Sequence, residues 1–397
     1  MLLKKWASLF FRINYPRRSE GSQSLTLFAE EESSMISITS KSLRLCAGAV
    51  LLLALVIYMT GCSPFYVMRA AYEQGKLIAA REDIAAVIAD PRTTPETRQK
   101  LSIVVEAREF SKTLALTPGD SFTMYADIGR DAASWVVVAS RKDSFTLKTW
   151  WFPIVGSVPY KGYFDKEDAI EEAKELAEDG YETWVRGADA FSTLGWFNDP
   201  VLSTTLRNDQ VQIANTVIHE ILHSTVWIPN YVEFNESLAN FVAYEGNLMF
   251  FEAQLEKCDV HNQTCRETTL KQIEQARYSR DREYEIAEVV QALYSDLDTL
   301  YTSSATMDEK LSKREEVFKR HVQPLRERYP NLKILTSVNN AEVIQLKIYL
   351  TKLHSFLMAF QQDRRDWAAF LKRIEEIKLG AEDGKEPYQM LEGSKAL

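Results

Sequence analysis

The pattern of apolar and polar positions divides the chain into helical and extended segments. After residue 62 apolar residues recur at helical spacing, and this pattern breaks at Asp90-Pro91. It restarts at Thr94-Pro95, where a capping residue precedes a proline at the first helical position. We therefore predict a helical hairpin over residues 62–120.

Between residues 121 and 192 the spacing changes from helical to extended. A short charged helix that ends at Gly180 interrupts this part of the chain. The flanking segments are rich in β-branched and aromatic residues with Gly and Pro between them, which predicts strands within residues 133–140, 144–160 and 181–193.

Helical spacing returns around His219 and continues on a second helix over residues 235–255. The remainder, residues 258–397, is expected to be helical, with its many charges on solvated helix faces. The pattern as a whole predicts an α+β fold that is mostly helical and carries a small mixed or antiparallel sheet.

The N-terminal segment departs from this globular pattern. Lys41 and Arg44 precede an apolar run over residues 45–59, and Met-Thr-Gly-Cys closes it at Cys62. The run of about fifteen residues is shorter than the roughly twenty that span a bilayer, so it fits a secretory signal. Its end resembles the bacterial lipobox, in which the Cys is acylated and becomes the first residue of the mature chain.

An uncleaved membrane anchor is the alternative interpretation of this segment. Both interpretations place the body of the protein outside the cytoplasm, tethered to a bacterial membrane and facing the periplasm or the exterior. Met35 stands where a signal peptide should begin, so residues 35–61 are the expected signal. Residues 1–34 are then a cytoplasmic extension or the product of a mis-assigned start.

The charge and the lack of repeats exclude some kinds of binding partner and fold. The 397 residues carry a net charge of -9, and no basic stripe interrupts the acidic balance. This argues against a nucleic-acid partner. No stretch repeats at a fixed period, which argues against a solenoid.

The four Cys residues fall into two groups. Cys46 lies in the expected signal and Cys62 at the expected lipidation site, which leaves Cys258 and Cys265 in a polar segment between helical patterns. In an oxidising compartment this pair is expected to form a disulfide. A metal site that uses the two Cys with His261 is the alternative.

The sequence HEILH places His219, Glu220 and His223 on one predicted helix. Residues four apart lie on the same helix face, so both imidazoles can bind one Zn²⁺ ion. Zinc lowers the pKa of a bound water to about 7, and Glu220 is placed to take its proton during attack on a carbonyl. The alternative is that both His residues only form hydrogen bonds on an ordinary helix and bind no metal.

A catalytic zinc site needs a third protein ligand. The turn signal Pro229-Asn230 lets the chain fold back, which makes Glu236 on the following helix the expected ligand and Glu233 the alternative. Asn240 comes one turn later. Its carbonyl oxygen is expected to accept a hydrogen bond from the outer N–H of a ligating His.

The sequence HEILH followed by NESLA resembles the glutamate-ligand class of zinc metallopeptidases. More closely, the chain resembles a bacterial family of predicted aminopeptidases, often lipoproteins, from about Cys62 to Phe251 and weakly nearer the C-terminus. The matching stretches include FYVMRAAYEQGKLI, WWFPIVGSVPYKGYFD, VIHEILHSTVW and FNESLANFVAYEG.

This resemblance implies a zincin-like core over residues 121–257, with the sheet beside the HExxH helix. It also implies His219, His223 and Glu236 as ligands of one zinc ion per chain, and Glu220 as catalytic base. In one respect the chain departs from many relatives of the wider class. They place an Asp where this chain has Asn240, and an amide polarises a ligating His less strongly than a carboxylate does.

Peptidases of this type bind an extended peptide along an edge strand. Residues 188–193 are the candidate for such a strand, although an ordinary sheet strand fits the pattern equally well. Trp196 and Phe197 next to it are candidates for the pocket rim or for the core. Tyr349 is the expected donor to a developing oxyanion, with His321 and His354 as alternatives.

We therefore expect a zinc-dependent peptidase that cleaves peptide bonds with metal-activated water. The helical segments on both sides of the core are large enough to close one end of a cleft, which favours an aminopeptidase over an endopeptidase. A non-enzymatic lipoprotein that binds a protein partner through its C-terminal helices, with zinc as a structural clamp, is the alternative class.

Overall fold

The structure is a computed structural model that describes residues 64–152, 156–188 and 200–393. The expected signal peptide, the lipidation site Cys62 and the pocket-rim candidates Trp196 and Phe197 lie outside the described residues. Of the candidate edge strand, only its first residue, Ala188, is described. No helix in the described part of the chain is long and apolar enough to cross a membrane.

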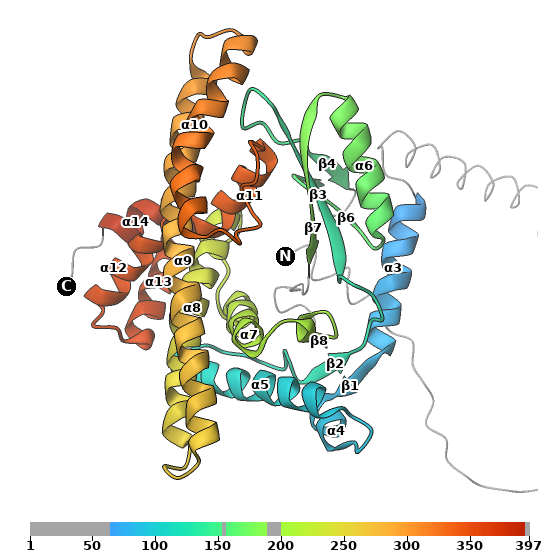
Figure 1. The fold of residues 1–397 in the computed structure, drawn as a ribbon, viewed down its shortest axis with the longest axis vertical. Coiled ribbons are helices and arrows are strands. Elements are labelled where there is room, and N and C mark those ends of the chain that lie inside the picture. The colour runs from blue at the N-terminus through green and yellow to red at the C-terminus, as the bar shows by residue number, and fades with distance from the viewer. Residues whose placement is uncertain (1–63, 153–155, 189–199, 394–397) are drawn as a thin grey trace, which may run out of the picture. The chain divides into compact units, whose positions relative to one another are not determined.

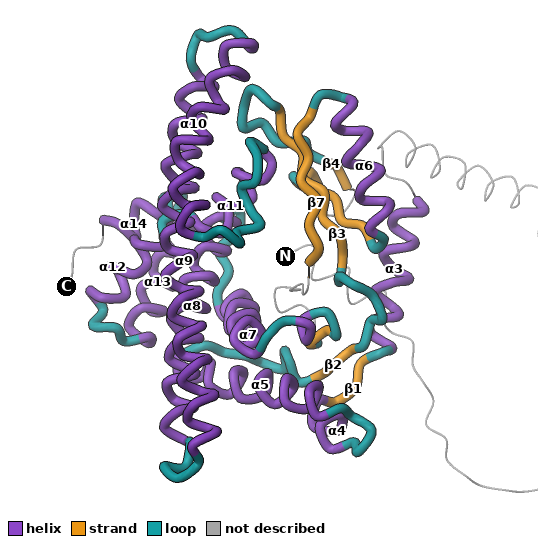
Figure 2. The backbone as a smooth tube through the Cα atoms, viewed as in Figure 1, coloured by secondary structure: helices purple, strands orange, loops and turns teal. Residues whose placement is uncertain are grey.

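The described residues form a mostly helical α+β fold with small sheets (Figures 1 and 2). The α-helices are α3 Pro64–Ala79, α4 Ile84–Ala89, α5 Pro95–Ser111, α6 Lys166–Glu178, α7 Gln210–Thr225, α8 Val232–Lys257, α9 Gln263–Thr302, α10 Met307–Arg328, α11 Asn340–Leu350, α12 Leu353–Gln362, α13 Trp367–Glu382 and α14 Pro387–Gly393. The strands are β1 Arg81–Asp83, β2 Met124–Ala126, β3 Ser134–Arg141, β4 Trp150–Phe152, β5 Gly156–Val158, β6 Lys161–Tyr163, β7 Tyr181–Ala188 and β8 Val201–Leu202, and two short 3₁₀ helices cover Lys112–Leu114 and Thr205–Arg207.

The first helical segment differs from the predicted hairpin in one arm. α5 begins at Pro95 with the Thr94 side chain as its cap, as the sequence predicted. The arm before it is divided, because β1 leaves the helical pattern and pairs antiparallel with β2. Asp83 ends that strand and caps α4 by accepting a hydrogen bond from the backbone N–H of Ala86.

The strands form three small sheets within the described residues. One has the order β1-β2-β8, with an antiparallel and a parallel pairing, and β4 and β5 form a hairpin. The third has the order β6-β3-β7 and is antiparallel throughout. β7 lies at an edge of this third sheet.

The two faces of the sheet β6-β3-β7 have different neighbours. Side chains of Val137, Ala139 and Val185 pack with α6, which covers one face. Alternation along the strands turns Trp184 and Arg186 to the opposite face. α11 contacts both β3 and β7 and connects this sheet to the helices α8 and α9.

The main apolar core is built around α7 and α8, which pack against each other and against α5, α9 and α11. Buried apolar residues from Ile84 to Leu391 belong to this one cluster. Residues of the predicted hairpin, core and C-terminal segments therefore share a single core. Cys258 and Cys265 form a disulfide across the loop between α8 and α9.

The turn between α7 and α8 is held by a buried amide. The Asn235 side chain accepts a hydrogen bond from the backbone N–H of Ile228 at 2.9 Å and donates one to the carbonyl oxygen of Ile228 at 2.8 Å. Both residues are buried. Asn230 within the turn has a φ of 72°, a left-handed conformation that Asn tolerates better than most residues. This pairing fixes where α8 starts relative to the end of α7.

Replacement of Asn235 by Ala should destabilise the protein by about 3 kcal/mol, because a buried N–H and a buried carbonyl of Ile228 would both lose their partner. Urea unfolding followed by circular dichroism measures this free energy. Gln212→Ala, at an exposed position on α7, is the control and should change it by less than about 0.5 kcal/mol. Equal unfolding midpoints for the two variants would contradict this role of Asn235.

Candidate metal centre

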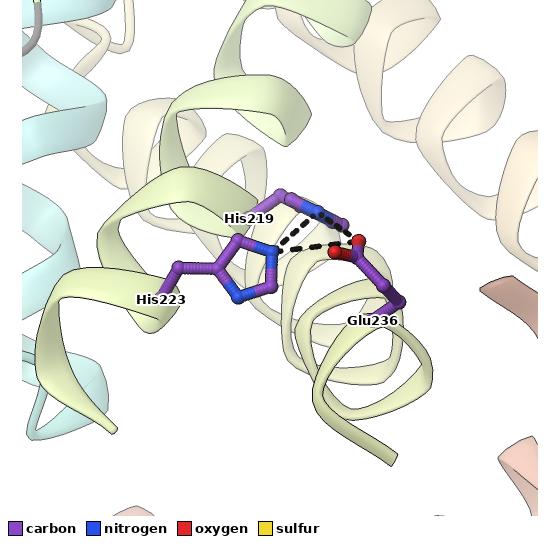
Figure 3. Close-up of side chains that lie close together, drawn as sticks. All are labelled: His219, His223 and Glu236. Carbon is purple, nitrogen blue, oxygen red and sulfur yellow. Dashed lines mark hydrogen bonds and ion pairs between the residues drawn. The ribbon is translucent and has the colours of Figure 1, made fainter. Parts of the chain in front are cut away.

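α7 presents two histidines on one face. The Asp209 side chain caps its start by accepting a hydrogen bond from the backbone N–H of Gln212. Its apolar face is buried in the core through Val217, Ile218, Ile221 and Leu222. With this face fixed, His219 and His223 lie one turn apart and direct their rings toward α8 (Figure 3).

α8 supplies the third member of the cluster. The Asn235 turn brings the first turns of α8 beside α7, and the carboxylate of Glu236 points at both imidazoles (Figure 3). Glu233, the alternative ligand, instead forms an ion pair with Lys347 of α11 at 2.5 Å. The structure therefore places Glu236, and not Glu233, beside the two His residues.

The three side chains converge with spacing that fits a zinc ion. The Nε2 atoms of His219 and His223 are 3.1 Å apart, and Glu236 Oε2 lies 3.4 Å and 3.5 Å from them. Tetrahedral zinc with bonds of about 2.0–2.1 Å places its ligand atoms about 3.3 Å apart. The three atoms thus lie near the corners of one face of such a tetrahedron, and the fourth corner carries no protein ligand from the described residues.

The electrostatics of the cluster favour a bound cation. Burial alone would lower the pKa of His219, but hydrogen bonding to Glu236, the charges of Glu220 and Glu236, and a hydrogen bond with Asn240 together raise it. For Glu236 burial acts to raise the pKa, and the two His residues outweigh it and lower the pKa. A positive charge between these groups is therefore favoured, and a metal ion supplies one.

Asn240 links the cluster to α11. Its Nδ2 donates a hydrogen bond to the backbone oxygen of Tyr349 at 2.7 Å, so its oxygen is left to accept from His219. His219 directs Nε2 into the cluster, so we expect Nδ1 to carry the proton that the Asn240 oxygen accepts. This arrangement selects the tautomer whose Nε2 lone pair can bind a metal.

The same contacts give a physical reason for Asn at a position where many relatives of the wider class have Asp. A carboxylate could accept the hydrogen bond from His219 but has no N–H to donate to the carbonyl of Tyr349. It would instead place a negative charge against that oxygen. In this chain the amide of Asn240 meets both requirements.

Tyr349 lies close to the cluster at the end of α11. Burial first, and then the negative charges of Glu236 and Glu220, raise the pKa of Tyr349 to about 12, although Arg186 acts in the opposite direction. Its hydroxyl accepts a hydrogen bond from Arg186 Nη2 at 3.2 Å. The phenol therefore keeps its proton at neutral pH and has it available for another acceptor.

The other candidate residues are placed elsewhere. His321 Nε2 lies 2.8 Å from Asp296, and His354 Nδ1 lies 3.5 Å from Glu288. Neither belongs to the group of possible metal ligands found in the described residues. The sulfurs of Cys258 and Cys265 are joined in a disulfide, which removes the thiolates that a site with His261 would need.

Two residues of this region carried no functional signal in the sequence. Asn235 stood out only as the residue before the expected ligand, and its hold on the turn depends on a backbone contact seven residues away. Arg186 lies on β7, and Tyr349, its hydrogen-bond partner, is 163 residues further along the chain. A single sequence gives no indication of that contact.

Comparison with known proteins adds one finding to this geometry. No curated protein and no solved structure shows significant similarity to the chain. A model of the family described as "Putative aminopeptidase" matches residues 65–387, which include α7, α8 and α11. The match covers well over half of the 397 residues, so the chain belongs to this aminopeptidase family.

Proposed function

We propose that the protein is a zinc-dependent aminopeptidase. The spacing of His219, His223 and Glu236 is the observation that carries the proposal, because three ligand atoms already stand where tetrahedral zinc needs them. Membership in the aminopeptidase family supports the reaction class. Three protein ligands with an open fourth position are typical of catalytic zinc, whereas structural zinc has four protein ligands.

Each residue of the site has a separate role in the proposed hydrolysis. Bound zinc would lower the pKa of water and polarise the peptide carbonyl. Glu220 follows His219 on α7 and is the base that takes the proton from the attacking water and passes it to the leaving amine. The Tyr349 hydroxyl donates a hydrogen bond to the carbonyl oxygen as negative charge develops there. Asn240 keeps His219 in the metal-binding tautomer.

The sheet β6-β3-β7 completes the zincin-like arrangement that we propose. β7 is an edge strand that precedes α7 in the chain, and Arg186 on it contacts Tyr349. An extended peptide that pairs with this edge would lie beside the cluster. The edge therefore serves as the substrate-binding strand.

We further propose that Cys62 is acylated and that the enzyme is held on a bacterial membrane, facing the periplasm or the exterior. The Met-Thr-Gly-Cys sequence at the end of the apolar run supports this proposal. The disulfide between Cys258 and Cys265 is compatible with an oxidising compartment of this kind.

The purified protein should contain about one zinc ion per chain, and His219→Ala should lose it, because two remaining ligands hold zinc weakly. Elemental analysis after dialysis measures the content. His354→Ala is the matched control, since His354 pairs with Glu288 and should leave zinc content unchanged. Full zinc content in the His219 variant would overturn the ligand assignment.

Replacement of Glu220 by Gln should leave zinc bound and lower the rate of peptide hydrolysis by about 10²–10⁴-fold, because the proton acceptor is lost. A mixed peptide library digested by the wild-type protein, with products identified by mass, tests the reaction class at the same time. Release of single residues from free amino termini is expected. Internal cleavage of amino-terminally blocked peptides would instead identify an endopeptidase.

Cells that express the wild-type chain with a labelled fatty acid should incorporate label into the protein, and Cys62→Ala should abolish incorporation and retain the uncleaved precursor. The signal sequence is unchanged in that variant, so only the acylated sulfur is removed. Unlabelled wild-type protein would rule out the lipid anchor.

A further inference from the structure

Arg186 carries a half-buried guanidinium that makes few hydrogen bonds to the described residues. Within them its one side-chain partner is the Tyr349 hydroxyl, which accepts from Nη2, and the cationic group lies over the rings of Tyr349 at 5.5 Å and Trp184 at 5.9 Å. Its Nε atom is buried and has no hydrogen-bond partner. Among the described residues, no carboxylate forms an ion pair with it.

Some other arginines with little exposure are paired with acids, whereas Arg98 and Arg326 bind backbone carbonyl oxygens. Arg314 forms an ion pair with Glu182, and Arg373 does so with Asp363 at 2.6 Å. A guanidinium that is shielded from water without such a partner is costly, unless an anion binds to it. The five N–H donors of Arg match the two oxygens of a carboxylate. Arg186 therefore has the donors and the surroundings of an anion-binding residue.

The position of Arg186 would place a bound anion near the candidate metal ligands His219, His223 and Glu236. Arg186 contacts Tyr349, the backbone oxygen of Tyr349 is bound by Asn240, and Asn240 contacts His219. Tyr349 therefore joins Arg186 to α8, the helix that carries Glu236 and Asn240. A group bound by Arg186 would belong to a substrate residue near the bond that is cleaved.

The backbone of β7 indicates where an extended peptide could pair with this strand. The carbonyl oxygen of Ala188 points toward β3, where it accepts from Ala133, and that of Thr183 points the other way, to Asn339. Alternation then directs the backbone groups of Val185 and Gly187 to the edge that faces away from β3. A peptide strand paired there would pass the Arg186 side chain.

We propose that Arg186 binds a carboxylate of the peptide substrate close to the cleaved bond. This inference rests on the proposed peptidase function and specifies its substrate class. The carboxylate is either the free C-terminus of a short peptide or an acidic side chain next to the cleaved bond. The enzyme then favours di- and tripeptides, or peptides with Asp or Glu at that position.

Calorimetric binding to the zinc-loaded Glu220→Gln protein tests the proposal without relying on turnover. Ala-Ala-Ala with a free C-terminus is compared with its C-terminal amide, and Ala-Glu-Ala amide with Ala-Gln-Ala amide. We expect at least one carboxylate peptide to bind about 10- to 100-fold more tightly than its neutral partner, as charge-assisted hydrogen bonds provide. The pair that shows the preference identifies the source of the carboxylate.

Adding Arg186→Gln should remove this preference, and Arg186→Lys should keep part of it, because Lys retains the charge without the planar donors. Arg141→Gln is the matched control on the neighbouring strand, and it should bind all peptides as the parent does. Zinc content verifies that each variant keeps its metal cluster. Equal binding of charged and neutral peptides in the parent, or an undiminished preference after Arg186→Gln, would overturn the inference.

The outcome is distinguishable from failure of the proposed function. If the wild-type protein cleaves no peptide of the library, the peptidase proposal fails. A carboxylate preference that depends on Arg186 would still establish the anion site. If the library is cleaved but the preference is absent, the peptidase stands and the role of Arg186 is wrong.

Discussion

Everything at the candidate site depends on how the chain returns from α7 into α8. The amide of Asn235 satisfies both backbone groups of Ile228, and only a side chain with a donor and an acceptor can do so. This contact sets the start of α8 and hence the position of Glu236 opposite His219 and His223. The spacing of the three candidate ligands is thus set by a hydrogen-bonded turn within a packed core.

The cluster gathers groups that are unfavourable in the absence of a cation. Two imidazole nitrogens and a carboxylate are brought to within 3.5 Å of one another in a largely buried place. Removal from water without compensation is costly for each of them. A metal ion would offset that cost, so metal binding and folding of this region are expected to be coupled. Asn240 adds to the coupling, because it joins the tautomer of His219 to the backbone of α11.

The sequence was sufficient for features that depend on local spacing. The HExxH helix, the cap at Thr94 and the helical C-terminal region all follow from patterns within a few residues. Contacts between distant segments were not predictable in the same way. β1 left a helical pattern because β2 offered a pairing partner, and Arg186 met Tyr349 because α11 packs against the sheet. Residues 1–63, with the expected signal, lie outside the described part of the chain.

Side chains alternate between the two faces of β7, so neighbouring residues of this strand have different partners. Val185 packs toward α6, whereas Arg186 contacts Tyr349 of α11. Insertion or deletion of a single residue before Arg186 within the strand would exchange these directions and bury a guanidinium in the apolar layer under α6. A change of length inside β7 therefore reverses the face of every residue beyond it. Arg186 lies three positions beyond Thr183, whose carbonyl oxygen binds Asn339 next to α11, so these two contacts with one helix fix the number of residues between them.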